Sequence, residues 1–443
     1  MTAQGTTLVS KAKMDPAPTG RRYPKHNQAT GFRTEPLTLV LMLVEHRAAP
    51  GAGIGLARWA EAQRDAILQQ IWMGTCPPGF DNPDRANHSR RMKILIVGAG
   101  PTGLTAAVEL ARRGIVPEII DRKEEASTLS RAVGVLPRSL RTLTPSGVAE
   151  RLLAEGVKMR NVHLYFDEKH TLELSLRNGH PDRDFGLALA QDRTEAALRD
   201  AFIRLGGRVG YGTELVGIRQ EHDKVLATAT GGAERTYDFV IGADGIRSVV
   251  REAVGIAFPG RDLPGNWSIA DVDAENWRHP ADFTACNLEG GRVAVVAPLA
   301  ATRFRVISNT DDALKTLPLE LNVKNVRRQG QFNISIRLVR TYRSGRVFLA
   351  GDAAHCHSPA GGRGMNLGIA DAAELADRLV TDRLDGYSAS RHADGKATIA
   401  ASEQARRLIT STGFMRRLLS TGAGLLNRLP PLHRPFARDF LQS

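Results

Sequence analysis

The chain has few cysteines and no long apolar run. Its 443 residues include three cysteines, an odd number at widely spaced positions, Cys76, Cys286 and Cys356. Such a set argues against a disulfide framework and is typical of a reducing cytoplasm. No apolar run reaches the roughly 18 residues that a membrane span needs, because the longest candidate, residues 37–44, is short and followed by charged residues. No secretory signal follows the N-terminal lysines. We therefore expect a cytoplasmic protein without a stable membrane association.

Acidic residues are also in deficit. The chain has 60 Lys and Arg against 47 Asp and Glu, which gives a net charge of +13. Nucleic-acid binding is one interpretation of such an excess. The basic residues are mostly arginines, however, and they are scattered between acidic residues without a lysine tract or an RNA-binding signature. We therefore expect no nucleic-acid partner, and we interpret the charge as a basic surface or funnel for anionic ligands.

Residues 1–91 differ from the rest of the chain in composition. Proline and glycine cluster at residues 15–20 and 76–83, as is typical of loops or disorder. We expect a poorly structured extension whose one helix spans residues 54–72. One hypothesis is that the biological start is Met92 and that the upstream segment is a misassigned translation; the alternative is a tail that regulates or targets the protein. An intact mass that includes residues 1–91 would contradict the first hypothesis.

A glycine motif follows the first strand after Met92. Residues 94–97 are apolar and mostly β-branched, and Gly98, Gly100 and Gly103 come directly after them. In a dinucleotide-binding unit, the first glycine allows a tight turn and the second lets the backbone approach a pyrophosphate. The third lets the next helix pack close to the strand. The spacing therefore predicts a βαβ unit that binds a dinucleotide.

The helix and the second strand of this unit are also visible in the sequence. The helix is predicted from Thr102 to about residue 113, so its N-terminal amide groups and partial positive charge would face the diphosphate. Gly114 ends the helix, and the next strand, residues 117–120, runs into Asp121. An acid at this position accepts hydrogen bonds from the adenosine ribose. This segment does not distinguish FAD from NAD.

Two more aspartates follow predicted strands and stand beside glycines. Asp244 comes after a strand at residues 237–241, and Asp352 comes after a strand at residues 345–350. The carboxyl edge of an open α/β sheet is where ligands bind. Taken alone, each aspartate is equally well explained as a helix cap or a turn residue. Together with the first glycine motif, they favour one ligand site assembled from three distant segments.

On these motifs, residues 92–391 resemble the group A flavoprotein monooxygenases, the superfamily of para-hydroxybenzoate hydroxylase and phenol hydroxylase. The most specific segment runs from Gly351-Asp352 to Asn366. The resemblance implies that Asp244 contacts the pyrophosphate region of FAD and assists NAD(P)H, and that Asp352 contacts the ribityl chain. It also implies that a glycine-rich loop lies beside the isoalloxazine ring, where glycines let the backbone come close. The residues of this third segment that we assign to the cofactor are Pro359, Gly362, Gly364, Met365 and Asn366.

Two further segments are similar to the same family. Arg131 lies in a segment that resembles the one whose arginine approaches the FAD diphosphate, and Gln191 lies in one that resembles the segment whose glutamine contacts the flavin. The resemblance therefore implies a cofactor contact for each. The alternative is that Arg131 is a surface arginine and that Gln191 is simply a polar residue at a helix start.

We expect an α/β fold in which a Rossmann-like FAD-binding domain, discontinuous in sequence, carries an inserted β-sheet substrate domain. The FAD-binding domain is assigned to residues 92–159, 187–254 and 346–382. The substrate domain is assigned to residues 160–186 and 256–345, with strand-like runs at 292–297, 304–308 and 331–339. Residues 383–443 form a helical C-terminal region, whose end we expect to pack on the protein and not to anchor it in a membrane.

The resemblance implies an enzyme that holds FAD and uses NAD(P)H and O2. NAD(P)H would bind transiently and reduce the flavin, since the chain has one credible dinucleotide fingerprint. A flavin C4a-hydroperoxide would then hydroxylate a small aromatic or polyketide-like substrate. No residue in the substrate half is marked as a catalytic acid or base. His355, Cys356 and His357 form no complete ligand set, so we expect no metal.

Three alternatives stay open. The first is a flavin oxidoreductase, a reductase or epoxidase, on the same scaffold. The second is an FAD-binding protein without turnover, and the third is a plain NAD dehydrogenase. The last would be colourless as purified, whereas product analysis for incorporated oxygen separates hydroxylation from reduction.

Overall fold

The computed structural model describes residues 92–126, 132–177, 184–232 and 234–442. The extension expected at residues 1–91, with its helix, and the candidate Arg131 lie outside the described residues.

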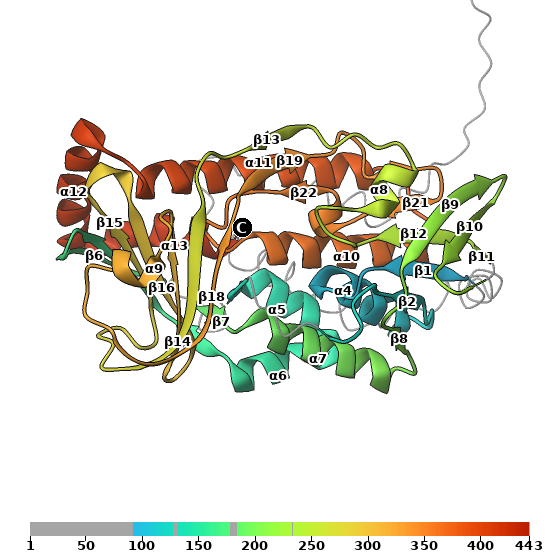
Figure 1. Ribbon diagram of the computed structural model, residues 1–443, viewed down its shortest axis with the longest axis horizontal. Coiled ribbons are helices and arrows are strands. Elements are labelled where there is room, and N and C mark those ends of the chain that lie inside the picture. Colours follow the sequence, from blue (N-terminus) through green and yellow to red (C-terminus); the bar gives the residue numbers. More distant parts are fainter. Residues whose placement is uncertain (1–91, 127–131, 178–183, 233, 443) are drawn as a thin grey trace, which may run out of the picture. The chain divides into compact units, whose positions relative to one another are not determined.

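A six-stranded sheet is built from segments that are far apart in the sequence, in the order β20-β21-β12-β1-β2-β8 (Figure 1). All neighbours are parallel except the edge pair β20–β21. Each residue of the central β1 is at most 7% exposed, as the continuous apolar run of a parallel strand predicts. The strands are β1 (Ile94–Val97), β2 (Glu118–Ile120), β8 (Val209–Gly210), β12 (Phe239–Gly242), β20 (Arg343–Ser344) and β21 (Val347–Leu349).

Three helices next to this sheet pack closely together. Helix α4 (Pro101–Ala111) follows β1 and contacts both α7 (Gln191–Arg204) and α10 (Gly364–Thr381). Glycine permits the close approach of α10, since a Cβ on Gly368 would lie 2.3 Å from Thr102 Oγ1. The remaining helices beside these segments are α5 (Pro137–Leu143), α6 (Val148–Glu155) and α8 (Val249–Ala253).

A seven-stranded sheet has the order β18-β14-β17-β16-β15-β5-β6 and is antiparallel except at β15–β5. Alternate residues point to opposite faces. One face packs Val272 and Phe304 near the short helix α9 (Ala313–Thr316), and the other carries Trp267 and Val295. The strands are β5 (Asn161–Phe166), β6 (Lys169–Ser175), β14 (Trp267–Glu275), β15 (Phe283–Asn287), β16 (Val293–Ala300), β17 (Arg303–Ser308) and β18 (Asn322–Phe332).

The single strand expected at residues 331–339 is wrong. Strand β18 ends at Phe332, where it pairs with β14, and β19 (Ser335–Leu338) belongs to another sheet, between β13 and β22. Apolar residues lie on both sides of the break, and Phe332 and Leu338 are each partly buried. Ile334 is 3% exposed between them. Besides β19, the strands of the three small sheets are β3 (Gly134–Val135), β4 (Val157–Met159), β7 (Gly186–Ala188), β9 (Leu215–Glu221), β10 (Lys224–Ala229), β11 (Arg235–Tyr237), β13 (Gly260–Asp262) and β22 (His355–Cys356).

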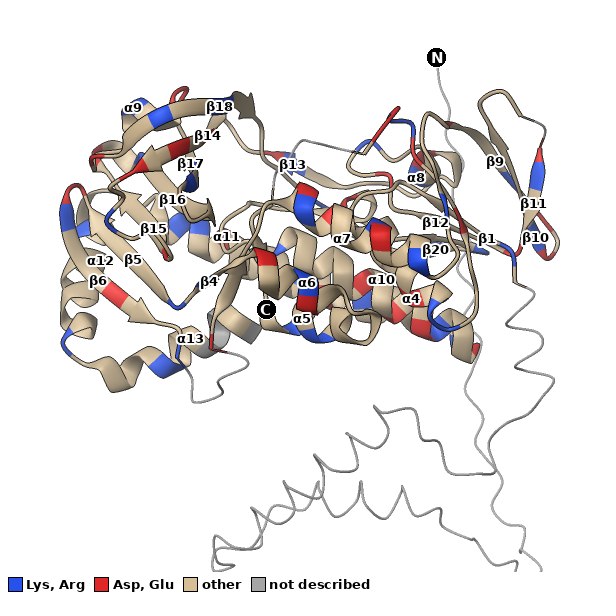
Figure 2. Cartoon of the chain, turned by 90° about the horizontal axis from the view of Figure 1, so that it is seen from below, with Lys and Arg blue, Asp and Glu red and all other residues tan. Residues whose placement is uncertain are grey.

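The C-terminal region is helical, with α11 (Tyr387–Ile409), α12 (Gly413–Asn427) and α13 (His433–Gln442). Helix α13 packs Ala437 and Leu441 against Leu176, whereas α12 contacts β6 but buries none of its own residues. Among the described residues, no helix has both the length and the apolar character needed to cross a membrane. Lysine and arginine residues lie interspersed with acidic residues over the described elements (Figure 2).

Candidate functional site

The first glycine motif forms a tight turn between β1 and α4. Gly98 has a φ of +104°, and a Cβ there would lie 2.3 Å from the carbonyl oxygen of Ala243. A Cβ on Gly103 would lie 1.9 Å from the carbonyl oxygen of Gly98. A Cβ on Gly100, by contrast, would meet no described atom within 4 Å. The turn is therefore closed toward the protein at two glycines and open at the third.

This open space adjoins the amino end of α4. Gly100 is the N-cap of the helix, Pro101 occupies its first turn, and no described side chain caps the helix amides. Thr102 Oγ1 is turned toward the third motif, since a Cβ on Gly351 would lie 2.4 Å from it. Uncapped amide groups together with the helix dipole form an anion site. The geometry therefore fits a diphosphate, as the spacing of the glycines predicts.

Asp121 is held beside the same turn. Its Oδ2 accepts a hydrogen bond from the amide of Ala99 at 2.8 Å, and its Oδ1 accepts one from the amide of Lys123 at 2.9 Å. The acid thus follows β2 and lies next to the glycine turn. This is the position from which an acid binds the ribose of a dinucleotide.

Asp244 has one carboxylate oxygen in use and one without a partner. Its Oδ2 accepts a hydrogen bond from the amide of Val250 at 3.1 Å, whereas Oδ1 is buried and has no hydrogen-bond partner among the described residues. Burial raises the pKa of Asp244 above its usual value. A buried acceptor without a donor costs about 1–3 kcal/mol. A ligand with a hydrogen-bond donor at this position would satisfy Oδ1 of Asp244.

The third motif begins at the carboxyl end of β21. Gly351 has a φ of +63°, and the exposed Asp352 follows it. Because β21 pairs with β12 and β12 pairs with β1, all three motifs leave neighbouring parallel strands at the same edge. The tertiary structure thus brings Gly98, Asp244 and Asp352 to one edge of the sheet, where ligands of open α/β sheets bind.

A buried ionic network lies beneath this motif. Asp371 is fully buried. It accepts hydrogen bonds from the amide of Gly351 at 2.9 Å and from Arg391 Nε at 2.6 Å, and its Oδ2 lies 2.7 Å from His355 Nε2. Desolvation raises the pKa of Asp371, but His355 and Arg391 outweigh it and hold that pKa below its usual value. Sequence reasoning missed Arg391, which lies beyond the motif in α11 and carries no local signal.

The loop after His357 is a tight turn with two glycines in left-handed conformations. Gly361 has a φ of +89° and Gly362 a φ of +64°, and the amide of Gly362 donates to the carbonyl oxygen of Pro359 at 3.0 Å. No described atom lies within 4 Å of a Cβ built on Gly362. Helix α10 then begins at Gly364, and Met365 packs partly buried against the core. The turn thus presents backbone to open space, as a loop beside a flat ring requires.

Asn366 ties this loop to β3. Its Oδ1 accepts from the amide of Leu136 at 2.8 Å, and its Nδ2 donates to the carbonyl oxygens of Gly134 at 3.0 Å and Gly362 at 2.8 Å. The side chain is 5% exposed. The amide group therefore positions the loop. Its predicted contact with the flavin stays a prediction.

Gln191 holds the residues that lead into β3. Its Oε1 accepts from the amide of Ala132 at 3.0 Å, and its Nε2 donates to Glu195 Oε1 at 2.8 Å. Burial raises the pKa of Glu195. The segment around β3 is thus fixed by two amide side chains that are far apart in the sequence. The flavin contact predicted for Gln191 also stays a prediction.

The seven-stranded sheet reaches this segment through a buried ion pair. Arg305 Nε and Nη2 donate to the two carboxylate oxygens of Asp271 at 2.7 and 2.8 Å, and Arg305 Nη1 lies 3.5 Å from the carbonyl oxygen of Ala132. Arg305 and Asp271 are at most 2% exposed. Sequence reasoning missed both residues. The signal in the sequence was weak: β17 has arginine at positions 303 and 305, on either side of Phe304.

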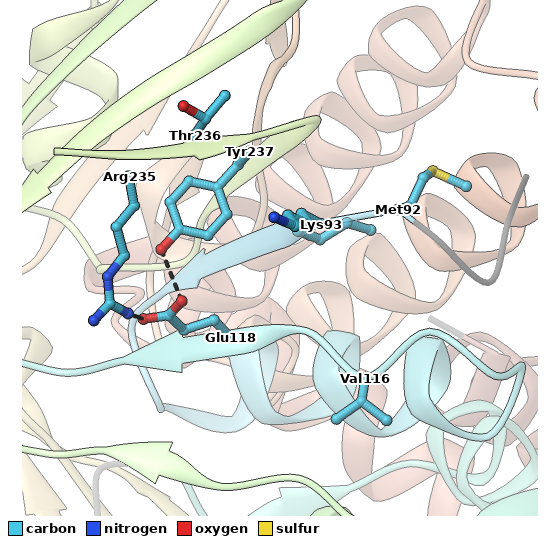
Figure 3. A pocket seen from close by; sticks show the side chains of 8 residues that line it. Met92, Lys93, Val116, Glu118, Arg235, Thr236 and Tyr237 are labelled. Carbon is cyan, nitrogen blue, oxygen red and sulfur yellow. Dashed lines mark hydrogen bonds and ion pairs between the residues drawn. The ribbon is translucent and has the colours of Figure 1, made fainter.

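A cavity of about 520 Å³ lies at the opposite edge of the six-stranded sheet (Figure 3). It adjoins the amino ends of β1 and β2. There the carboxylate of Glu118 accepts hydrogen bonds from Tyr237 Oη at 2.8 Å and from Arg235 Nη1 at 2.9 Å. Ligands of open α/β sheets bind beyond the carboxyl ends of the strands. This cavity is therefore distinct from the site that the three motifs form.

Comparison with known proteins bears directly on this site. A family model described as FAD binding domain matches residues 91–402. Pentachlorophenol 4-monooxygenase from Sphingobium chlorophenolicum is 31% identical over 380 residues, which cover 78% of this chain and 68% of that protein. The 6-methylpretetramide 4-monooxygenase from Streptomyces rimosus is 31% identical over 391 residues, 81% of this chain and 68% of that protein.

A solved structure shares the fold. The crystal structure of p-nitrophenol 4-monooxygenase from Pseudomonas putida has a TM-score of 0.72 and 22% identity, and the match covers 78% of this chain and 96% of that one. The predicted α/β fold class is confirmed.

Proposed function

The chain belongs to the FAD-binding family of flavin-dependent aromatic monooxygenases, and from this premise we propose which of its residues hold FAD and which substrate class it hydroxylates. The predicted family, the FAD cofactor and the predicted class of enzyme are confirmed. The observation that carries the proposal is the convergence of three motifs at the carboxyl ends of the neighbouring strands β1, β12 and β21.

We assign the dinucleotide half of FAD to the first two motifs. The open space at Gly100 and the uncapped amides of α4 would hold the diphosphate, and Asp121 would accept from the adenosine ribose. Oδ1 of Asp244, for which the described residues offer no hydrogen-bond donor, would accept a hydrogen bond from the cofactor or from NAD(P)H. When bound, FAD supplies the redox chemistry that protein side chains lack.

The third motif would hold the flavin half. Asp352 is exposed at the end of β21, where it would accept from the ribityl hydroxyl groups. The turn at residues 359–362 offers backbone to one side of the ring, and Asn366 keeps that turn against β3. Fixing the loop in advance matters because a ring that is misplaced by an ångström loses much of its reactivity.

The substrate would lie between this loop and the seven-stranded sheet. The face of that sheet that carries Arg305 also bears Trp267 and Val295, which are buried, and Ile307, which is partly buried. The buried Ile334, which follows the end of β18, packs in the same cluster. An apolar wall with a few fixed polar groups is typical of sites for planar organic ligands. We therefore propose an electron-rich, phenolic aromatic substrate of the small or polyketide-like kind, hydroxylated with NAD(P)H and O2.

We propose a cytoplasmic protein, because the two cysteines in the described part of the chain, Cys286 and Cys356, are both free. Burial raises the pKa of each thiol to about 12, so neither is reactive at neutral pH. We also propose that the protein has no nucleic-acid partner, since basic and acidic residues are interspersed over its described elements (Figure 2).

The test has two stages. The purified protein should show flavin absorption and release FAD on denaturation; a colourless protein that takes up no added FAD would contradict the cofactor assignment. The holoenzyme should then consume NAD(P)H faster with a phenolic substrate and place one atom of ¹⁸O₂ in the product. Reduced product without label would favour the reductase, labelled epoxide the epoxidase, and no NAD(P)H oxidation with any phenol a binding protein without turnover.

A further inference from the structure

Three histidines gather on the seven-stranded sheet, away from the flavin site. His163 lies on β5, His170 on β6, and His279 in the connection between β14 and β15. One ring nitrogen of each lies within 4.8 Å of the others. His163 alternates with Leu164 along β5 and shares a face with Tyr165, which packs with Val272 and Phe304. Arg305 alternates with Phe304 on β17, so the histidine cluster is on the face opposite to the Arg305–Asp271 pair.

The ring nitrogens of the cluster face one another and neighbouring polar groups. His163 Nδ1 lies 3.2 Å from His170 Nε2, and His163 Nε2 lies 3.4 Å from Asp282 Oδ2. The ring centroids of His163 and His279 are 3.6 Å apart. His163 is 4% exposed, whereas His170 is exposed to solvent. The cluster is therefore anchored on its inner side and open to ions on its outer side.

We propose that His163, His170 and His279 bind a divalent transition metal, with Zn²⁺ as the occupant that best suits the donor set. Three imidazoles and one water complete a tetrahedral shell for Zn²⁺, and imidazole also suits Cu²⁺ and Ni²⁺. Asp282 accepts hydrogen bonds from the amides of Arg160 and Asn161 at 3.1 and 2.9 Å. Its carboxylate is thereby fixed behind His163, in the position of the carboxylate that orients a metal-binding histidine.

Little movement is needed to close the site. Tetrahedral Zn–N bonds of the usual length place ligand nitrogens about 3.4 Å apart, and His163 and His170 are already at 3.2 Å. His279 must turn from its 2.8 Å hydrogen bond with Tyr165 Oη and from its stacked position. It is in a connection between strands and not in a strand, so it can rotate without breaking a sheet.

A bound metal would act as a clamp. It would join the β5–β6 hairpin, at the edge of the sheet, to the β14–β15 connection. The expectation that the chain holds no metal was drawn from His355 and His357 and did not include these three residues. His163 and His170 lie on one hairpin, but His279 is far along the chain from both, so only the fold brings the three residues together. The clamp is independent of the flavin assignment, because its three histidines belong to the seven-stranded sheet and its connections, whereas the flavin motifs follow strands of the six-stranded sheet.

The test titrates the FAD-loaded full chain with ZnCl₂ by calorimetry after removal of metals with a chelator. We expect saturable binding, and the His170→Ala variant should weaken it by roughly tenfold or more. The matched control is His222→Asn, because His222 is an exposed histidine with a φ of +46° and asparagine tolerates this left-handed conformation. The control should bind Zn²⁺ like the wild type.

Two readouts distinguish a three-histidine site from loose binding to other histidines. Co²⁺ in place of Zn²⁺ should give the visible bands of a tetrahedral complex, and both His170→Ala and His279→Gln should abolish them. Zn²⁺ should also raise the melting temperature of the wild type and of His222→Asn, but not that of His170→Ala. Absence of saturable binding, or equal affinity in His170→Ala and the wild type, would overturn the proposal. FAD content, measured in parallel, tests the proposed function separately.

Discussion

The two large sheets carry their chemistry in different ways. In the six-stranded sheet, the site consists largely of backbone: Gly98, Gly100 and Gly351 shape turns at the ends of parallel strands. In the seven-stranded sheet, the polar groups are side chains that meet across strands, as in the Arg305–Asp271 pair and the three-histidine cluster. A site made of backbone needs glycines at short, fixed spacing, and this can be read from a sequence. A site made of side chains from distant strands leaves no such pattern.

The largest expected effect is in the seven-stranded sheet. Replacing Arg305 by Met leaves the carboxylate of Asp271 buried and unpaired, which should destabilise the protein by about 3–5 kcal/mol. Urea unfolding of the variant and of the wild type measures this difference. The double variant Arg305→Met/Asp271→Leu removes both charges and should recover most of the loss. If the double variant were as unstable as the single one, the cost would come from packing and not from the stranded charge.

The next comparison lies within the glycine motif. Gly98→Ala forces a side chain into a left-handed turn and against the Ala243 carbonyl, so we expect destabilisation on the order of 3 kcal/mol together with loss of FAD. Gly100→Ala meets open space in the protein and should leave the melting temperature of the apoprotein unchanged while weakening FAD binding. Thermal melting and flavin fluorescence measure the two effects. Equal FAD affinity in Gly100→Ala and the wild type would contradict the diphosphate assignment.

Replacing Asn366, which anchors the loop at residues 359–362, should destabilise the protein less than Gly98→Ala. Asn366→Ala removes three hydrogen bonds and leaves the amide of Leu136 without its acceptor, at a cost of about 2 kcal/mol. Because the loop loses its tie to β3, NAD(P)H oxidation should become less coupled to product formation. The ratio of product to NAD(P)H consumed measures the coupling. A destabilised variant with unchanged coupling would limit Asn366 to a role in stability.

One histidine in each region predicts a pH dependence. Burial lowers the pKa of His357 and of His279 to about 4 in the folded protein. The unfolded chain therefore binds protons more readily, so each histidine's contribution to stability is complete above about pH 6.5 and is lost as the pH falls toward 4. His357→Gln and His279→Gln should each flatten the stability curve over this range. A curve as steep as that of the wild type would show that the histidine is not neutral when folded.

The smallest effect is expected at the opposite edge of the six-stranded sheet. Tyr237→Phe removes the hydrogen bond to Glu118 beside the cavity there, which should cost about 1 kcal/mol. FAD affinity should not change, because this edge holds the amino ends of the strands (Figure 3). A loss of FAD affinity comparable to that of Gly100→Ala would mean that the two edges are coupled.

Much of the six-stranded sheet could be predicted because its signals are local. The strand at residues 94–97 and the helix after it were predicted within two residues of β1 and α4. In the seven-stranded sheet, the runs at 292–297 and 304–308 correspond to β16 and β17. The single strand expected at 331–339 was wrong because an alternating pattern predicts extended chain with one apolar face but does not indicate to which sheet each residue belongs. The cofactor contacts of Asn366 and Gln191 stay predictions, and the hydrogen bonds of these two side chains to the β3 segment could not be foreseen from the sequence.

The sequence by itself determined the family, the FAD cofactor and the glycine turns, because a turn that must approach a diphosphate restricts the residues at a few neighbouring positions. The tertiary structure decided which side chains share a site. It brought Arg391 to Asp371, Arg305 to Asp271 and His279 to His163. The physical reason is that strand order and register set these distances, and both depend on burying whole sheet faces and not on any local pattern of residues.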